Sequence, residues 1–192
     1  MQSLKERILR DGTVLDGNIL KVDNFINHMI DPGLFMEMGK EYYDYFKDKN
    51  ITKIITIEVS GIGLAVTTGY IFQVPVLFAK KTISKTLSEN CYETKVYSYT
   101  KKTTYTVRVD KRMLNSGDNV LIIDDFLANG EALKGLIDIV EQAGAKVAGI
   151  GIAIEKGFQK GGELIRSEGY DLKSLAIIKE FKDGSIIFDQ NK

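Results

Sequence analysis

Residues 120–132 read VLIIDDFLANGEA, and this stretch decides the fold class of the chain. Its first four residues, 120–123, are apolar and mostly branched, which is typical of a strand covered on both faces in a parallel sheet. Asp124 and Asp125 follow and are predicted to end the strand at the carboxyl edge of the sheet. Open α/β sheets bind their ligands at that edge, so the two acids are the first candidates for a functional site.

A helix is predicted after the acids, because apolar residues recur at helical spacing from 133 to 140 and Gly144 is suited to end the helix. The small residues and the glycine within 126–132 leave backbone N–H groups free at the positive end of this helix, where a phosphate group binds readily. Carboxylates beside an anion site need a different partner. The hydroxyl groups of a sugar, or a magnesium ion, would satisfy them.

Strands and helices alternate around this unit between about residues 50 and 155. A second glycine loop at 59–63 precedes a helix that ends near Phe72. The alternation predicts an α/β fold with a central, mostly parallel twisted sheet flanked by helices. Apolar runs place three more strands at 53–58, 74–79 and 146–155.

The pattern is less regular outside this alternation. A short helix is predicted at 2–11, and another begins at Asp31 and Pro32, because Asp31 can cap a helix and Pro32 suits its first turn. Residues 13–30 are expected to be mixed and extended and 82–95 irregular, with a hairpin at 96–100 and 105–109, a short helix at 163–168, and strands at 172–181 and 185–188.

The composition narrows the class of protein. The chain has 192 residues, which fits a single domain with a substantial core. Lysine plus arginine and aspartate plus glutamate each number 26, so the net charge is zero, which argues against general binding to nucleic acids or membrane surfaces. Cys91 is the only cysteine, so no internal disulfide can form. With no apolar leader or spanning run, these features predict a cytoplasmic protein.

Two other phosphate-binding folds are excluded by their motifs. The sequence has no G-x-x-x-x-G-K-[ST] loop, so the acid pair does not belong to a P-loop enzyme. The dinucleotide pattern fails as well, because Val66 stands where a third glycine after Gly61 and Gly63 is needed. Other residues at the predicted sheet edge could contribute to a site, but they also have ordinary interpretations. Lys80, Lys81 and Lys156 could be solvated charges at strand ends, and residues 82–105 could be a surface loop.

These residues together resemble a known family, the type I phosphoribosyltransferases. Its signature for 5-phosphoribosyl 1-pyrophosphate (PRPP) is similar to residues 122–132, IIDDFLANGEA. With Leu20, Asn27 and the EKGFQ stretch at 155–159, the resemblance runs essentially end to end and is strongest to the bacterial xanthine phosphoribosyltransferases. It implies a core at about 38–155 and a small hood over the base, built from about 1–37 and 156–192.

The resemblance implies a purine salvage transferase that converts xanthine and PRPP to xanthosine 5′-phosphate (XMP) and pyrophosphate. Mg²⁺ would be the cofactor, held mainly by PRPP rather than by direct protein ligation. The enzyme would be a homodimer in which a basic loop residue reaches the partner's site. Residues 82–105 would form a lid that excludes water during transfer.

The resemblance also implies three groups of site residues. Asp124 and Asp125 are the catalytic acids that hold the ribose hydroxyls. Xanthine would be bound by Leu20, Asn27 and Lys156, since the ammonium group donates to a 6-oxo group and the amide to a 2-oxo group. PRPP would be bound by Glu58, Ser60, Gly61, Lys80 and Lys81 at the pyrophosphate, and by Ala128, Asn129, Gly130, Glu131 and Ala132 at the 5′-phosphate.

Two alternatives stay open at this stage. A guanine or hypoxanthine phosphoribosyltransferase would share the PRPP site and differ only in its base contacts. A non-catalytic, PRPP-sensing regulator of the same fold would need a DNA-binding module. The chain offers no spare extension for one, and its zero net charge gives no sign of a basic face.

Overall fold

A six-stranded sheet forms the centre of the computed structural model, which describes residues 1–81, 90–98, 102–182 and 184–189. The strand order is β10-β9-β8-β7-β3-β4; neighbouring strands from β9 to β4 run parallel, and β10 pairs antiparallel with β9 at one edge. The predicted α/β class with a mostly parallel sheet is therefore confirmed. The strands are β3 (Lys53–Ile57), β4 (Val76–Ala79), β7 (Asn119–Leu127), β8 (Lys146–Lys156), β9 (Leu172–Lys182) and β10 (Ser185–Phe188).

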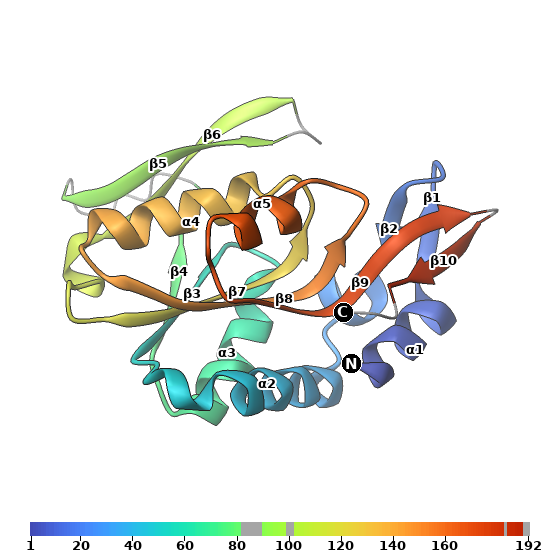
Figure 1. The fold of residues 1–192 in the computed structure, drawn as a ribbon, viewed down its shortest axis with the longest axis horizontal. Helices are drawn as coiled ribbons and strands as arrows, with labels where there is room; N and C mark the ends of the chain where they lie inside the picture. Colours follow the sequence, from blue (N-terminus) through green and yellow to red (C-terminus); the bar gives the residue numbers. More distant parts are fainter. Residues whose placement is uncertain (82–89, 99–101, 183, 190–192) are drawn as a thin grey trace.

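Helices cover both faces of the sheet, as Figure 1 shows. On one face lie α2 (Pro32–Phe46) and α3 (Gly61–Phe72), and on the other lie α4 (Glu131–Gln142) and the short α5 (Gly161–Ser167). Asp31 caps α2 by accepting a hydrogen bond from the Leu34 N–H at 3.1 Å, as its sequence predicts. Short 3₁₀ turns, η2 (Lys47–Lys49) and η3 (Lys111–Met113), connect neighbouring elements.

Two smaller units flank this core. A two-stranded ribbon of β5 (Cys91–Ser98) and β6 (Thr103–Asp110) packs over α4. The other unit lies beside β9 and β10 and begins at the N-terminus (Figure 1). It contains α1 (Gln2–Asp11), the hairpin of β1 (Thr13–Leu15) and β2 (Ile19–Lys21), and the π-helical turn η1 (Asp23–Asn27).

Apolar side chains fill a separate core on each side of the sheet. Two glycines of β8 let the rings of α2 pack directly on the sheet. A Cβ atom added to Gly149 would lie 2.4 Å from Cε1 of Phe46, and one added to Gly151 would lie 2.8 Å from Cε1 of Tyr42. The position of α2 therefore depends on the absence of side chains at these two points.

Several predicted boundaries were wrong, chiefly because strand pairing is not visible in a local pattern. Strand β7 continues through Asp124 and Asp125 to Leu127, since its backbone keeps pairing with β8. The predicted loop at 59–63 is interrupted by α3, which begins at Gly61, and β4 begins at Val76 rather than at residue 74. Residues 13–30 hold a hairpin and a π-helical turn, and α5 begins at Gly161 rather than at 163.

The predicted irregular segment at 82–95 also needs correction, while the lid stays a prediction. Strand β5 begins at Cys91, so residues 91–95 are not irregular, and Cys91 does not lie in a loop. Val96, Val107 and Val109 are buried, which explains why the ribbon is held against the body of the protein. The parts of the predicted lid at 82–89 and 99–101 lie outside the described residues.

Replacing Gly149 by alanine should destabilise the protein, because the new methyl group would have to displace the Phe46 ring. We expect the free energy of unfolding to fall by about 1–3 kcal/mol, the usual range for an overpacked core. Urea denaturation followed by circular dichroism would measure the change. Gly117→Ala is the matched control, because a Cβ atom there meets nothing within 4 Å; equal stability losses in the two variants would contradict this account of the α2 contact.

Candidate active site

Three adjacent parallel strands bring the predicted site residues to one edge of the sheet. Strand β3 leads into residues 58–60, its neighbour β7 leads into residues 128–130, and β8 ends at Lys156. Parallel strands present their carboxyl ends together, which is why segments far apart in the sequence meet here. The edge therefore combines two glycine-bearing loops with the acid pair and a lysine.

Asp124 is buried at this edge, and Asp125 beside it is partly exposed. Asp124 is only 5% exposed, and its Oδ1 accepts a hydrogen bond from the Asp125 N–H at 3.0 Å. Burial raises the pKa of Asp124 well above its ordinary value, and the neighbouring charge of Asp125 raises it further. Burial also raises the pKa of Asp125. Two carboxylates in this setting favour a ligand that donates hydrogen bonds or carries positive charge.

The first loop lies directly against the acids. A Cβ atom at Gly61, where α3 begins, would lie 2.9 Å from Oδ1 of Asp124 and 2.2 Å from Oγ1 of Thr56. Glycine is therefore the residue that fits between the helix start and the carboxylate. The Thr56 hydroxyl is buried and has no hydrogen-bond partner among the described residues. Ser60 is partly exposed next to this contact, and the peptide bond before Val59 is cis.

The structure separates the two lysines that follow β4. Their side chains leave the strand on opposite sides, as successive residues of an extended chain do. Lys81 Nζ lies 5.1 Å from the centroid of the Tyr105 ring, and its charge acts on both acids of the pair. Its N–H also donates to Glu58 Oε1 at 2.6 Å, which ties β4 to the first loop.

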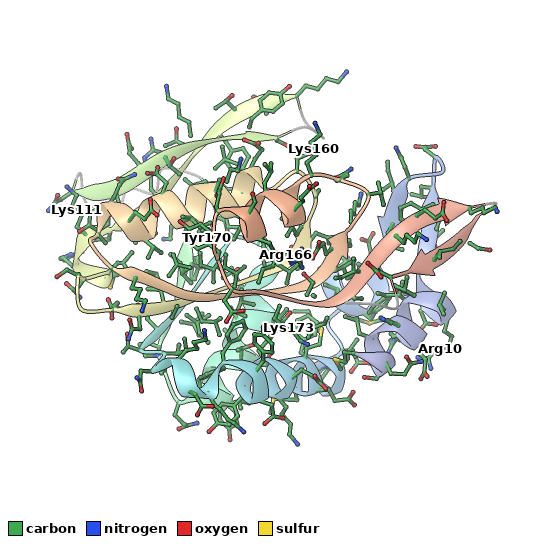
Figure 2. The ribbon with its side chains drawn as sticks, viewed as in Figure 1. Arg10, Lys111, Lys160, Arg166, Tyr170 and Lys173 are labelled. Atoms are coloured by element: carbon green, nitrogen blue, oxygen red, sulfur yellow. The ribbon has the colours of Figure 1, made fainter. Side chains whose placement is uncertain are left out.

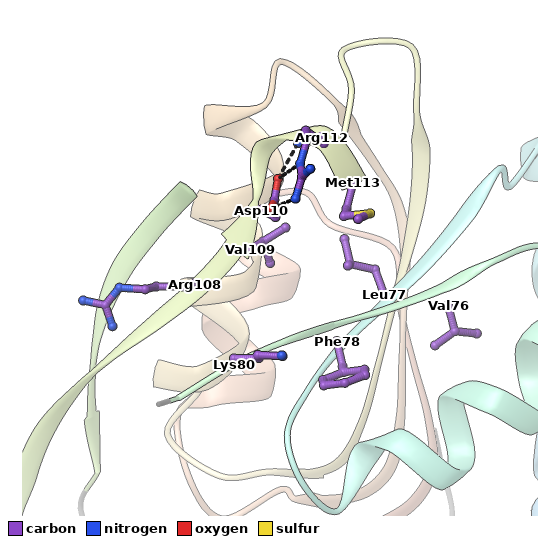
Figure 3. A pocket seen from close by; sticks show the side chains of 9 residues that line it. All are labelled: Val76, Leu77, Phe78, Lys80, Arg108, Val109, Asp110, Arg112 and Met113. Atoms are coloured by element: carbon purple, nitrogen blue, oxygen red, sulfur yellow. Dashed lines mark hydrogen bonds and ion pairs between the residues drawn. The ribbon is translucent and has the colours of Figure 1, made fainter. Parts of the chain in front are cut away.

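Lys80 instead lines a cavity away from the acid pair, shown in Figure 3. This cavity has a volume of about 270 Å³ and lies between β4, β6 and η3. The backbone of Lys80 exchanges two hydrogen bonds of 2.9 Å with Arg108, and its Nζ lies 5.9 Å from the Phe78 ring centroid. No residue of the acid pair or of the two loops lines it. Of the two lysines predicted at the pyrophosphate, Lys81 is therefore the one whose charge acts on the acids.

The second loop forms one wall of a cavity of about 200 Å³. Gly130 has φ +90°, a conformation that favours glycine, and it leaves the first N–H groups of α4 without a side-chain cap. Burial of Tyr105 raises the pKa of its hydroxyl, with Asp124 as the second cause. All five residues predicted at the 5′-phosphate line this cavity: Ala128, Asn129, Gly130, Glu131 and Ala132.

The opposite wall of this cavity includes Tyr97 and Tyr105 of the ribbon, which were not predicted as site residues. The available signal was the alternation within the predicted hairpin. That alternation places Tyr105, opposite Val96, on the face toward α4 and Tyr97 on the other face, so it does not reveal that both residues line this cavity.

The three residues predicted at the base are brought together only in part. Lys156 is half-buried, burial lowers its pKa, and its Nζ donates to the Asn18 carbonyl at 3.4 Å. This contact brings the β1–β2 hairpin, which carries the buried Leu20, to the end of β8. Asn27 is exposed on η1, and its role at the base stays a prediction.

Two features of the described residues bear on metals and membranes. The part of the chain that the structure describes holds no group of three or more His, Cys, Asp or Glu side chains that could bind a metal ion. None of its helices combines the length and the apolar character needed to cross a bilayer.

Comparison with known proteins places this geometry in a family. The model of the phosphoribosyl transferase domain matches residues 31–185. Proteins named xanthine phosphoribosyltransferase from Finegoldia magna and Ruminiclostridium cellulolyticum are 62% and 58% identical to this chain, over 98% and 99% of it and 100% of each relative.

Solved structures agree in fold. Adenine phosphoribosyltransferases from Trypanosoma brucei and Rhodothermus marinus superpose with TM-scores of 0.76 and 0.74 at 15% and 20% sequence identity. The matches cover 98% and 93% of this chain and 86% and 100% of those chains, and at such low identity they speak for the fold alone. The domain match and the close relatives decide the matter, and the chain belongs to the type I phosphoribosyltransferase family.

Proposed function

We propose that this protein transfers the phosphoribosyl group of PRPP to xanthine, forming XMP and pyrophosphate. The observation that carries the proposal is the meeting of two loops that open helices, the acid pair and Lys156 at the ends of three adjacent strands. PRPP carries a monophosphate and a pyrophosphate, which accounts for two loops. The relatives named xanthine phosphoribosyltransferase support xanthine as the base.

The reaction asks the protein mainly to position groups and to stabilise charge. C1 of the ribose loses pyrophosphate through an oxocarbenium-like transition state, and N9 of the base attacks it. The N–H groups of the loop at 58–61 would receive the leaving pyrophosphate, with the charge of Lys81 beside them. The loop at 128–132 would hold the 5′-phosphate at the start of α4.

The acid pair is suited to the ribose hydroxyls of PRPP and to the Mg²⁺ ion bound with it. Asp124 and Asp125 are oxygen donors whose burial raises their pKa values, so ribose hydroxyls or a cation would relieve the cost of ionising them. Mg²⁺ prefers oxygen ligands, and PRPP itself would supply most of them. When bound with PRPP, the ion would neutralise charge on the leaving pyrophosphate.

The base contacts follow from hydrogen-bond chemistry. The ammonium of Lys156 only donates, so it suits the 6-oxo group of xanthine and disfavours the 6-amino group of adenine. The Asn27 amide would donate to the 2-oxo group, which guanine replaces by an amine. Leu20 would add an apolar or backbone contact from the hairpin that Lys156 touches.

A homodimer is part of the proposal, with a second copy covering α3. This helix contains no charged residue, which is typical of a buried helix, yet one side of it is open. Val66 and Tyr70, four residues apart, are 52% and 69% exposed, and Val59 just before the helix is 74% exposed. A basic loop residue of each copy would reach the partner's site, whereas Lys81 lies beside the acid pair of its own copy. We also propose a cytoplasmic location, where the single Cys91 would stay reduced.

Pyrophosphate release with PRPP and Mg²⁺ would test the reaction and the base in one experiment. We expect turnover with xanthine to exceed turnover with guanine, hypoxanthine, adenine and orotate. Lys156→Ala should raise KM for xanthine about 10- to 100-fold, as for loss of a charged hydrogen bond, and should leave KM for PRPP nearly unchanged.

Lys146→Ala is the control for that variant, because Lys146 is an exposed lysine at the other end of the same strand. A preference for guanine or hypoxanthine would keep the PRPP site and reject the base assignment. PRPP binding without turnover on any base would favour a regulator.

Asp124→Asn should stabilise the protein at pH 8 while lowering turnover about 10²-fold or more. Because burial raises the folded-state pKa above the ordinary value of 3.8, wild-type stability falls as pH rises from that value through the folded-state pKa. The advantage of the variant should therefore grow with pH. Thermal unfolding at several pH values would measure it, each 1 kcal/mol corresponding to about 2–4 °C at this size.

Asp31→Asn gives the opposite sign and serves as the control. The Leu34 N–H, followed by the Arg7 guanidinium, lowers the pKa of Asp31, so its carboxylate contributes stability that is lost as pH falls through the lowered pKa. This variant should be less stable than wild type at pH 8. A loss of stability in Asp124→Asn at pH 8 would show that burial is not the main influence on the pKa of Asp124.

Tyr70→Glu should split the proposed dimer. Burying a charge in an apolar interface should raise the dissociation constant of the dimer at least about 30-fold, equivalent to about 2 kcal/mol. Light scattering after size-exclusion chromatography would read the mass. Leu9→Glu is the control, since Leu9 is 58% exposed on α1; a wild-type protein that is already monomeric would refute the dimer.

A further inference from the structure

A partly buried ion pair lies next to the lysine of the proposed base site. Glu155 precedes Lys156 in β8 and is 3% exposed. Arg166 of α5 holds it with two parallel hydrogen bonds, Nη1 to Oε1 at 2.8 Å and Nη2 to Oε2 at 2.7 Å. The hydroxyl of Ser174, from β9, also donates to Oε2. Figure 2 shows Arg166 on α5, above the sheet.

Two glycines at the start of α5 fit this pair closely against the second loop. A Cβ atom at Gly162 would lie 2.0 Å from Oε1 of Glu155. A Cβ atom at Gly161 would lie 2.4 Å from the Ala128 carbonyl oxygen, to which the Gly161 N–H donates at 3.1 Å. The first turn of α5 therefore touches the ion pair on one side and the phosphate loop on the other.

The strand register supplies a second route between the same two points. Glu155 in β8 stands opposite Leu127 in β7, and Leu127 immediately precedes the phosphate loop. Successive side chains of a strand point to opposite faces, so Glu155 holds the end of β8 from the face opposite to Lys156. The pair can fix the position of the base lysine without occupying the base site.

We propose that Glu155 and Arg166 are positioning residues that set the separation between the phosphate loop, 128–130, and Lys156. The inference rests on the proposed function, in which these two points hold the two substrates. C1 of the ribose and N9 of the base must meet, and a misplacement of about 1 Å can lower a rate about 10²-fold. The pair itself touches neither substrate.

A purely structural ion pair is the competing explanation, so the variants must separate the two. Removing one partner alone would leave a buried charge unpaired and could unfold the protein. Arg166→Lys keeps the charge but loses the two-pronged geometry. The double variant Glu155→Gln/Arg166→Met removes both charges together.

The control is another partly buried ion pair at the opposite edge of the sheet. Lys53 Nζ lies 2.8 Å from Asp118 Oδ2 near the amino ends of β3 and β7, with side chains 13% and 15% exposed. Lys53→Met/Asp118→Asn repeats the same neutralisation far from the carboxyl edge. Each variant would be measured for its Tm, for ribose 5-phosphate affinity by calorimetry, and for kcat and both KM values.

We expect both Arg166 variants to bind ribose 5-phosphate about 10-fold more weakly and to lose about 10²-fold in kcat. The control should lose Tm without these changes. Equal ribose 5-phosphate affinity and kcat in the Arg166 variants and the control, at similar Tm loss, would overturn the positioning role. A wild type that turns over no base, with ribose 5-phosphate affinity lost only in the Arg166 variants, would keep the positioning role and refute the proposed function.

Discussion

The burial of Asp124, beside the partly exposed Asp125, at the carboxyl edge of a parallel sheet is the constraint on which the proposed site depends. Asp124 is almost fully enclosed, and its oxygen lies so close to Gly61 that the start of α3 admits no side chain there. Its hydrogen bond from the Asp125 N–H and the charge of Lys81 offset only part of the cost of ionisation, since its pKa remains raised. The surroundings of Asp124 thus disfavour its ionised form, which lowers the stability of the protein. Such a loss of stability in favour of function is usual at active sites.

Parallel topology explains how this constraint becomes a site. Each of three neighbouring strands ends in one functional part: β3 in the first loop, β7 in the acids and second loop, and β8 in Lys156. Segments near both ends of the described chain pack against β9. The Met1 amino group donates to the Leu175 carbonyl at 2.5 Å, and the Asp189 N–H to the Ile177 carbonyl at 2.8 Å, so the N-terminus and Asp189 are both held on β9. The division into core and hood stays a prediction, although β9 itself belongs to the central sheet.

The sequence predicted the fold well where local pattern and burial agree. The apolar run at 120–123 and the helical spacing after it identified β7 and α4, and the cap at Asp31 marked the start of α2. The prediction failed where pairing between distant segments determines the structure. Charged residues seemed to end β7, but β8 supplies partners as far as Leu127. The side chains of Lys80 and Lys81 were grouped as neighbours, whereas Lys80 lines a cavity beside β6 and Lys81 lies near Tyr105. Only the fold reveals which of the two approaches the acids.

A chain with no net charge can serve a strongly anionic substrate because backbone N–H groups provide much of the attraction. Backbone N–H groups are the same for almost every residue type, so a sequence does not reveal them directly. It reveals only the glycines that allow close approach to them. Gly61 is required where α3 begins against Asp124, and Gly130 is required by φ +90° where α4 begins beside the second loop. Gly161 and Gly162 extend the same logic to α5, which must approach both the loop and the Glu155–Arg166 pair. The glycines thus mark close backbone approaches around the proposed site. In that proposal, the few charged side chains would decide where the base and the phosphates lie.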